Sequence, residues 1–321
     1  MKNILFLFLF PCLCLYGFAQ ETTVNLQTNT GKVEGTLSIP SNVSHCPVVL
    51  IIAGSGPTDR NGNNNMGLKT DAYKQLADTL RQHGIASLRY DKRGIAASQS
   101  LLFKESDVRF DTYIQDAKAW IDQLETDKRF SKIIVAGHSE GSLIGMAACE
   151  NNLKVAAFIS ISGAGRPADE LLKEQLQTLP QEIKNYIFGV IDKLKKGETE
   201  TNVPVQYNSL FRASVQPYLI SWFKYDPQIV IAKLNIPILI VQGSTDIQVS
   251  VKDAELLAKA QPKAQLVIIP GMNHALKNCA TTAQTEQMVT YGNADLPLNK
   301  EFATTVIHFI INGIKTKEEN K

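Results

Sequence analysis

The stretch that decides the fold is Lys132-Ile-Ile-Val-Ala-Gly137-His138-Ser139-Glu140-Gly141-Ser-Leu-Ile-Gly-Met-Ala-Ala148. Its β-branched start predicts a buried strand, and the small and apolar residues at its end predict a helix. Between them stands Gly-x-Ser-x-Gly, a turn that lifts the Ser139 Oγ clear of a sheet. Glycine is expected at 137 and 141 because side chains there would collide with the neighbouring strand and helix. The first free N–H groups of the helix then point at whatever Ser139 attacks, so the Glu140 amide is a candidate oxyanion donor.

The flanking sequence repeats the alternation of strands and helices. Residues 24–26 and 33–39 predict an opening hairpin, and further strands are predicted at 48–53, 86–90, 132–136, 155–160, 236–241 and 265–269. Helical periodicity is found near 70–83, 107–125, 140–151, 252–260 and 300–313. This order predicts an α/β fold with a mostly parallel sheet and right-handed crossovers.

The alternation fails once, from about residue 165 to 233. This segment contains charged, Leu-rich helical stretches punctuated by Pro180, Pro204 and Pro217, and no strand pattern. Because the strand pattern resumes at 236, we interpret the segment as a helical cap inserted into one domain that spans 20–321.

The composition excludes several classes of protein. The chain has 321 residues, 44% of them apolar, and its 33 basic and 31 acidic side chains give a net charge of +2. Such a balance offers no basic field for nucleic acid and no excess of charge that would prevent folding. Asp59, Asn61 and Asn63 match the spacing of a calcium loop only in part, since Asn64 and Thr70 stand where glycine and glutamate are required. We therefore expect no metal and no other cofactor.

Residues 1–19 resemble a signal peptide. A single lysine precedes an apolar run at 4–16, and Gly17-Phe18-Ala19 supplies small residues for cleavage after Ala19. The run is shorter than a membrane-spanning helix requires. We expect export to the periplasm or beyond, with a lipoprotein anchored through Cys12 or Cys14 as the minor alternative.

Three cysteines remain after the leader: Cys46, Cys149 and Cys279. This number is odd and too small for a disulfide framework in so long a chain. We expect buried thiols, and the sequence leaves open whether one pair forms a bridge.

The elbow at Gly137–Gly141, between its strand and helix, resembles the nucleophile site of the α/β-hydrolase superfamily. A serine hydroxyl needs a general base, which at neutral pH is a histidine. Of His45, His83, His138, His274 and His308, only His274 follows a C-terminal strand in a loop, where this resemblance places the base.

The base needs a carboxylate that orients it. Gly243-Ser-Thr-Asp246-Ile-Gln-Val249 ends a predicted strand and resembles the acid loop of these enzymes. Asp226 and Asp253 are the rivals, the first inside the inserted segment and the second at a helix start, where an acid is usually structural. Ser139, Asp246 and His274 follow the chain order of an α/β-hydrolase triad.

The resemblance also implies a second oxyanion donor, the amide of Ser55 in Gly54-Ser55-Gly56-Pro57-Thr58-Asp59-Arg60. The stretch Asp91-Lys-Arg93-Gly94-Ile-Ala96-Ala-Ser98 is similar to a turn of this fold that carries glycine where Ala96 stands. If this turn needs a positive φ at Ala96, alanine costs about 1 kcal/mol there.

We therefore expect a serine hydrolase of the carboxylesterase or aminopeptidase-like branch. It should cleave small carboxylic esters, with short-chain acyl esters as the first expectation, through an acyl-enzyme. A serine exopeptidase or amidase with the same triad is the alternative, and a non-catalytic binding protein is a third. An exopeptidase should place acids in the cap to bind a substrate amine, and the candidates are Glu170, Glu174, Glu182 and Glu198. Aromatic residues at 218, 222, 223 and 225 either roof a pocket or form the core of the cap. We expect no nucleic-acid partner and no membrane attachment after cleavage; the oligomeric state stays open.

Overall fold

The computed structural model describes residues 20–41, 43–100 and 103–314. The predicted leader at 1–19 lies outside the described residues. In the described part of the chain, no helix combines the length and apolar character needed to span a bilayer.

Eight strands form one sheet in the order β1-β2-β4-β3-β5-β6-β7-β8. The strands are β1 (Gln20–Thr28), β2 (Gly31–Ile39), β3 (Cys46–Ile52), β4 (Ala86–Tyr90), β5 (Phe130–His138), β6 (Val155–Ile161), β7 (Ile238–Gly243) and β8 (Gln265–Ile269). β1 and β2 are an antiparallel hairpin, β2 pairs antiparallel with β4, and β3 to β8 are parallel. The predicted α/β class with a mostly parallel sheet is confirmed.

Strand β3 shows why these segments are apolar on consecutive residues. Val48, Leu50 and Ile52 point into the core on one face of the sheet, and Val49 and Ile51 point into the core on the other. All five are at most 2% exposed. Each such burial contributes about 1.5–3 kcal/mol, so both faces of the sheet must be covered by helices.

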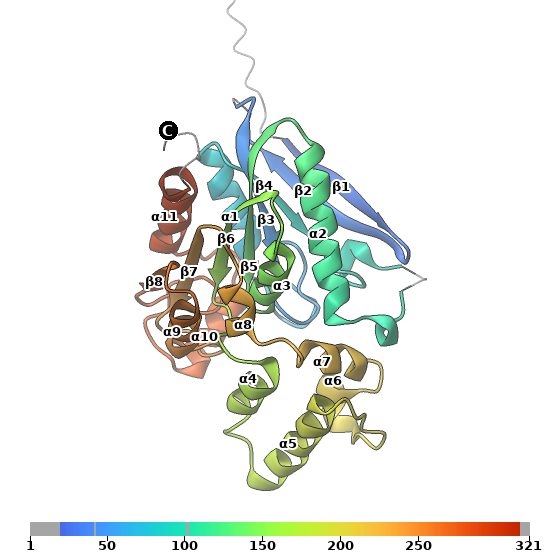
Figure 1. Ribbon diagram of the computed structural model, residues 1–321. Coiled ribbons are helices and arrows are strands. Elements are labelled where there is room, and N and C mark those ends of the chain that lie inside the picture. The colour runs from blue at the N-terminus through green and yellow to red at the C-terminus, as the bar shows by residue number, and fades with distance from the viewer. Residues whose placement is uncertain (1–19, 42, 101–102, 315–321) are drawn as a thin grey trace, which may run out of the picture.

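Two layers of helices cover the sheet (Figure 1). The core on one face includes residues of α2 (Phe110–Thr126), α3 (Glu140–Cys149), α8 (Pro227–Ala232) and α9 (Val251–Ala260). The opposite core includes residues of α1 (Ala72–Gln82) and α11 (Lys300–His308), which continues as a π-helical turn, η4 (Phe309–Gly313). The 3-10 turns η1 (Ala96–Ser98) and η2 (Glu105–Asp107) link β4 to α2.

The inserted segment forms helices and contains no strand, as predicted. It consists of α4 (Ala168–Gln175), α5 (Gln181–Lys195), the 3-10 turn η3 (Val205–Tyr207), α6 (Asn208–Phe211) and α7 (Gln216–Trp222), followed by α8. α4 to α7 share a separate apolar core that includes Ile191, Phe211, Leu219 and Phe223. They lie together beyond one end of the sheet, as Figure 1 shows. α8 differs because Val230 and Ile231 pack into the core beneath the sheet.

One helix is absent from the sequence-based expectations: α10 (Gln284–Tyr291). Only Gln287 and Thr290 of this helix are buried, so it has no apolar stripe that a periodicity could reveal.

The three described cysteines, Cys46, Cys149 and Cys279, are buried and free, so no disulfide forms among them.

Candidate active site

Ser139 occupies a strained turn between β5 and α3. Its φ of 54° and ψ of −122° lie outside the usual regions for a residue with a side chain. A Cβ on Gly137 would lie 2.1 Å from the carbonyl oxygen of Gly141, and a Cβ on Gly141 would lie 2.3 Å from the carbonyl oxygen of Ile52. Neither position tolerates a side chain, which is the physical reason for both glycines.

His274 and Asp246 meet at the end of the sheet. They lie in the loops that follow β8 and β7, and the His274 Nδ1 is 2.7 Å from the Asp246 Oδ2. The Asp246 Oδ1 also accepts hydrogen bonds from the amides of Gln248 at 2.8 Å and Val249 at 2.9 Å. Burial alone would raise the pKa of Asp246, but the His274 side chain and these amides hold it below the usual value. The carboxylate therefore keeps the Nδ1 proton in place and leaves Nε2 as the basic nitrogen.

The rival acids lie elsewhere and have other partners. Asp253 pairs with Arg166 at 2.7 Å and accepts from the Ser250 hydroxyl. Asp226 caps α8 by accepting a hydrogen bond from the Gln228 amide at 2.9 Å. Among these three carboxylates, only that of Asp246 contacts His274.

Three of the four other histidines lie away from Asp246 and have other partners or positions. His45 contacts the Lys128 carbonyl, His83 contacts the Thr79 carbonyl of its own helix, and His308 lies on α11. His138 is the exception, because its ring lies 4.6 Å from the His274 ring between centroids. His274, the candidate base, is thus packed against the residue that precedes Ser139.

A buried chain of hydrogen bonds runs through His138. The Gly54 amide donates to the Tyr73 hydroxyl at 3.2 Å, which is 2.8 Å from the His138 Nδ1. The His138 Nε2 donates to the His274 carbonyl at 3.0 Å. Burial, aided by the neighbouring His274, lowers the pKa of His138 to about 3, so its ring is neutral and can accept at one nitrogen while it donates at the other.

The two candidate oxyanion donors lie beside Ser139. A Cβ on Gly54 would be 3.2 Å from the Ser139 Cβ, so the loop after β3 packs directly on Ser139. Within the described part of the chain, neither the Ser55 amide nor the Glu140 amide donates a hydrogen bond to another protein group. Both amides are therefore free to bind an oxyanion.

Ser139, Ser55 and Glu140 line a cavity of about 670 Å³ between the sheet and the cap. Its walls are largely apolar side chains from the cap and from α2, among them Tyr113, Leu171, Leu172, Ile191, Phe211, Leu219 and Trp222. A cavity of this size holds a small organic molecule. Of the four aromatic residues at 218, 222, 223 and 225, Tyr218 and Trp222 line the cavity, whereas Phe223 lies in the core of the cap and Tyr225 packs against Phe110.

The cap glutamates do not line this cavity. Glu170, Glu182 and Glu198 are exposed, and Glu174 pairs with Arg166 at the surface. The acids among the described lining residues are Glu105 and Glu140. Glu105 pairs with Arg212, and Glu140 with Lys92.

Lys92 and Tyr73 are site residues that the sequence reasoning missed. The Lys92 Nζ lies 2.8 Å from the Glu140 Oε1 and 2.6 Å from the Gly54 carbonyl oxygen, and its side chain is 2% exposed. For Lys92, the available signal was a basic residue two positions after the end of a buried strand. The turn that follows has Ala96 at a φ of 42°, which is the positive value that favours glycine.

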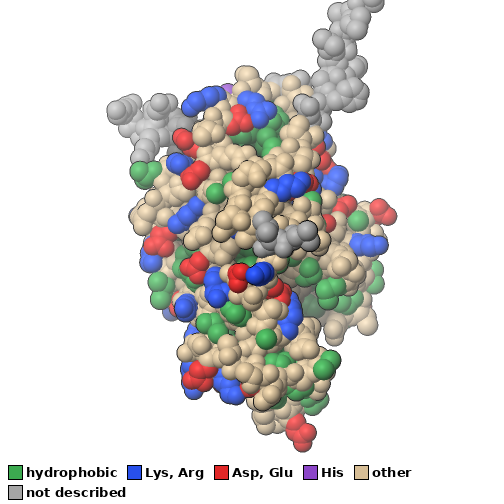
Figure 2. All heavy atoms as spheres, turned by 90° about the vertical axis from the view of Figure 1, so that its right-hand side faces the viewer, with side chains coloured by type: hydrophobic (Ala, Val, Ile, Leu, Met, Phe, Trp, Pro, Cys, Tyr) green, Lys and Arg blue, Asp and Glu red, His purple; other side chains and the backbone are tan. Residues whose placement is uncertain are grey.

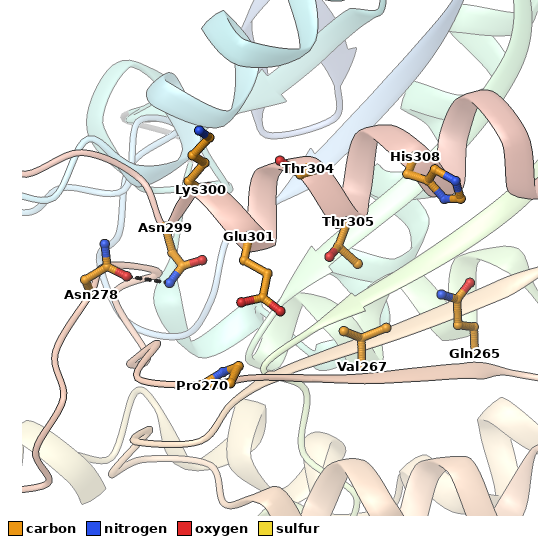
Figure 3. Close-up of a pocket in the computed structure, with 10 residues that line it drawn as sticks. All are labelled: Gln265, Val267, Pro270, Asn278, Asn299, Lys300, Glu301, Thr304, Thr305 and His308. Carbon is orange, nitrogen blue, oxygen red and sulfur yellow. Dashed lines mark hydrogen bonds between the residues drawn. The ribbon is translucent and has the colours of Figure 1, made fainter.

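A second hollow of about 690 Å³ lies between β8 and α11, and Ser139, Asp246 and His274 are not among its lining residues (Figure 3). Most of its lining residues are polar types, among them Glu301, Thr305 and His308 from one side of α11. At one end of the hollow, the Asn299 Nδ2 donates a hydrogen bond to the Asn278 Oδ1 at 2.6 Å. No group of three metal-binding side chains occurs in the residues that the structure describes, this hollow included.

Comparison with known proteins finds hydrolases that this chain is similar to. Residues 65–215 match the family model described as serine aminopeptidase, S33. The chain is similar to Esterase EstD of Thermotoga maritima, with 25% identity over 285 residues that make up 85% of this chain and 65% of that protein. This chain therefore spans just under two thirds of the length of EstD.

Two solved structures share the fold. Est1E from Butyrivibrio proteoclasticus, solved with ferulic acid bound, is 20% identical with a TM-score of 0.59, covering 90% of this chain and 99% of that one. The α/β hydrolase GrgF from Penicillium sp. sh18 is 18% identical with a TM-score of 0.55, covering 79% of this chain and 91% of that one.

Proposed function

We propose that this chain, which is an α/β-hydrolase of the serine esterase and aminopeptidase-like branch, hydrolyses carboxylic esters through an acyl-enzyme on Ser139. The observation that carries the proposal is one cluster of groups around Ser139. The strained Ser139 shares a cavity with the free amides of Ser55 and Glu140. The His274 ring, paired with Asp246, lies 4.6 Å from the ring of His138, the neighbour of Ser139. The similarity to an esterase supports the same conclusion.

The reaction follows from these positions. The Ser139 Oγ attacks the ester carbonyl while His274 takes its proton, and the developing oxyanion is held by the amides of Ser55 and Glu140. His274 then protonates the leaving alcohol, and the acyl group stays on Ser139. A water molecule, deprotonated by His274, attacks this acyl-enzyme, and the carboxylic acid and free Ser139 are released.

The charges around the cavity favour uncharged substrates. Its basic lining residues are each paired with a carboxylate: Lys92 with Glu140, Arg93 with Asp116, Arg166 with Asp253 and Arg212 with Glu105. No unpaired carboxylate among the described lining residues is available to bind a substrate amine. This arrangement favours an ester over the amine-bearing substrate of an exopeptidase. On the face shown in Figure 2, basic and acidic side chains are interspersed, so no single-sign surface there would attract a charged polymer.

The test is a panel of substrates on the purified protein. It comprises p-nitrophenyl esters of increasing acyl length, methyl ferulate, because Est1E was solved with ferulic acid, and aminoacyl p-nitroanilides. We expect ester hydrolysis, starting from short acyl groups, to exceed arylamide hydrolysis by orders of magnitude. Faster arylamide turnover would establish the exopeptidase alternative instead.

We further propose that the protein is exported, on the strength of the leader sequence at residues 1–19. Expression with and without these residues, followed by fractionation and N-terminal sequencing, tests this. We expect an exported product that begins at Gln20. A product that stays in the cytoplasm with residues 1–19 intact contradicts it.

A further inference from the structure

Lys92 joins two loops that each supply one oxyanion donor. The side chain comes from the segment after β4, which neighbours β3 in the sheet, and it is 2% exposed. The Nζ donates to the Gly54 carbonyl oxygen at 2.6 Å and to the Glu140 Oε1 at 2.8 Å. It also lies 5.2 Å from the centre of the Tyr113 ring. A lysine ammonium has three donors, and these three contacts surround it.

The contact with Gly54 acts on the Ser55 amide through the peptide bond. The Gly54 carbonyl and the Ser55 N–H belong to one planar trans peptide unit and point in opposite directions. Fixing the carbonyl oxygen therefore fixes the direction of the N–H. The Gly54 amide is held in turn by the Tyr73 hydroxyl at 3.2 Å.

The contact with Glu140 acts on the second donor. Glu140 follows the nucleophile, its side chain is 3% exposed, and its own amide is the other free donor. One ammonium thus holds the loop of the first donor and the residue of the second in a fixed relation. A buried ion pair contributes little net stability, since desolvation offsets the attraction, so stability alone does not explain the pair.

We propose that Lys92 is a positioning residue that sets the geometry of the oxyanion hole by bonding to both Gly54 and Glu140. Its role rests on the proposed serine hydrolase function. It acts through the backbone amides of Ser55 and Glu140 and takes no part in proton transfer.

The main variant is Lys92→Met, which keeps the length of the side chain and removes the ammonium. We expect kcat for a p-nitrophenyl ester to fall about 100-fold, because a misplaced oxyanion donor costs that order of activity, while KM stays within about twofold. Binding of a trifluoromethyl ketone, whose adduct with the serine carries an oxyanion, should weaken by the same factor. A rise in KM at unchanged kcat would overturn the proposal.

Lys92→Met also leaves the Glu140 carboxylate buried without a cation, which can unfold the protein. The double variant Lys92→Met/Glu140→Gln removes this buried charge, and we expect it to recover most of the lost thermal stability. Its kcat should stay about 100-fold below that of the wild-type protein, because the Gly54 carbonyl still lacks its hydrogen bond from Lys92. Recovery of kcat together with stability would show a merely structural role and refute the proposal. Glu140→Gln alone retains an acceptor for Lys92, so a loss of less than about tenfold is expected.

The matched control is Lys195→Met in the cap. Lys195 makes the same kind of bridge, to the Asp169 carboxylate at 2.8 Å and to the Phe223 carbonyl at 2.7 Å, away from the oxyanion loops. We expect it to lower thermal stability only slightly, because the Lys195 side chain is 42% exposed, and to leave kcat within about twofold. A loss of kcat equal to that of Lys92→Met would contradict the proposal.

A fluorophosphonate separates this proposal from the ester assignment. Ser139 attacks phosphorus and displaces fluoride, a reaction that needs the oxyanion hole but no particular substrate. If the wild-type protein is labelled but hydrolyses no ester, the proposed function fails while Lys92 is still tested by the labelling rate. We expect this rate to fall about 100-fold in Lys92→Met. An unchanged rate refutes the positioning role.

Discussion

The contacts within the end of the sheet differ in kind from the contacts within the cap. At the end of the sheet, the side chains of Asp246, His138, Glu140 and Lys92 are all less than 10% exposed and are bonded across loops from different strands. In the cap, pairs such as Lys195 with Asp169 involve a side chain that is 42% exposed. Exposed pairs contribute little and are screened by salt. We infer that the buried network sets the geometry of the reacting groups. The cap, which is easier to deform, selects the substrates that reach them.

The largest effect should come from breaking the buried network at its acid. Asp246→Asn removes the charge that orients His274, and we expect kcat to fall about 10⁴-fold without unfolding, as in other triads. Asp226→Asn is the control, because asparagine can also cap α8 through its side-chain oxygen. A larger loss of kcat in Asp226→Asn or Asp253→Asn would reassign the acid.

The second prediction concerns His138 and pH. Its pKa is about 3 in the fold, because of burial and then of His274, against an ordinary value of 6.5. Between these values the unfolded chain binds a proton that the folded chain does not, so stability is fully present above pH 6.5 and is lost as the pH falls toward 3.

His138→Gln should remove this dependence. We expect the free energy of unfolding of the wild-type protein to fall, relative to the variant, by about 1.4 kcal/mol for each pH unit below 6.5. Urea unfolding at pH 7, 5.5 and 4.5 measures it. The same difference in His83→Gln, an exposed histidine, would show that the effect is not specific to His138.

A substitution in the cap should change which acyl lengths are accepted and leave the rate of the chemical step unchanged. Leu171 lines the cavity, so Leu171→Trp should narrow it. We expect kcat/KM for an octanoyl ester to fall about tenfold and that for an acetyl ester to stay within about twofold, since overpacking typically costs 1–3 kcal/mol. Val205→Trp, at a cap residue 82% exposed, is the control and should change neither. An equal loss for both esters would mean that the cap also shapes the reacting centre.

The smallest effect is expected at Ala96. Its φ of 42° is unfavourable for alanine, so Ala96→Gly should raise the free energy of unfolding by about 0.5–1 kcal/mol. Ala97→Gly, next to it, has no positive φ to relieve and should destabilise the protein instead. Urea denaturation of both variants measures the difference. Stabilisation by Ala97→Gly, or none by Ala96→Gly, contradicts this account of the turn.

The same contrast separates what the sequence could predict from what it could not. Strand β5, the elbow and helix α3 follow from local pattern, and Asp246 and His274 follow from their places after strands. The contact of Lys92 with Glu140 depends on β4 and β5 both lying beside β3, a strand order that no local pattern reveals. The neutral His138 required knowledge of burial, and α10 has no apolar stripe. The shape of the cavity depends on how cap side chains such as Leu171 and Trp222 pack.

The most direct test of the central claim is to trap the acyl-enzyme. The wild-type protein is mixed with a p-nitrophenyl ester, quenched in acid within the first turnover and examined by intact and peptide mass spectrometry. We predict a mass increase equal to the acyl group on the peptide that contains Ser139, and no increase in Ser139→Ala, whose turnover is abolished. Full turnover by Ser139→Ala, or an acyl group on another residue, would contradict the account.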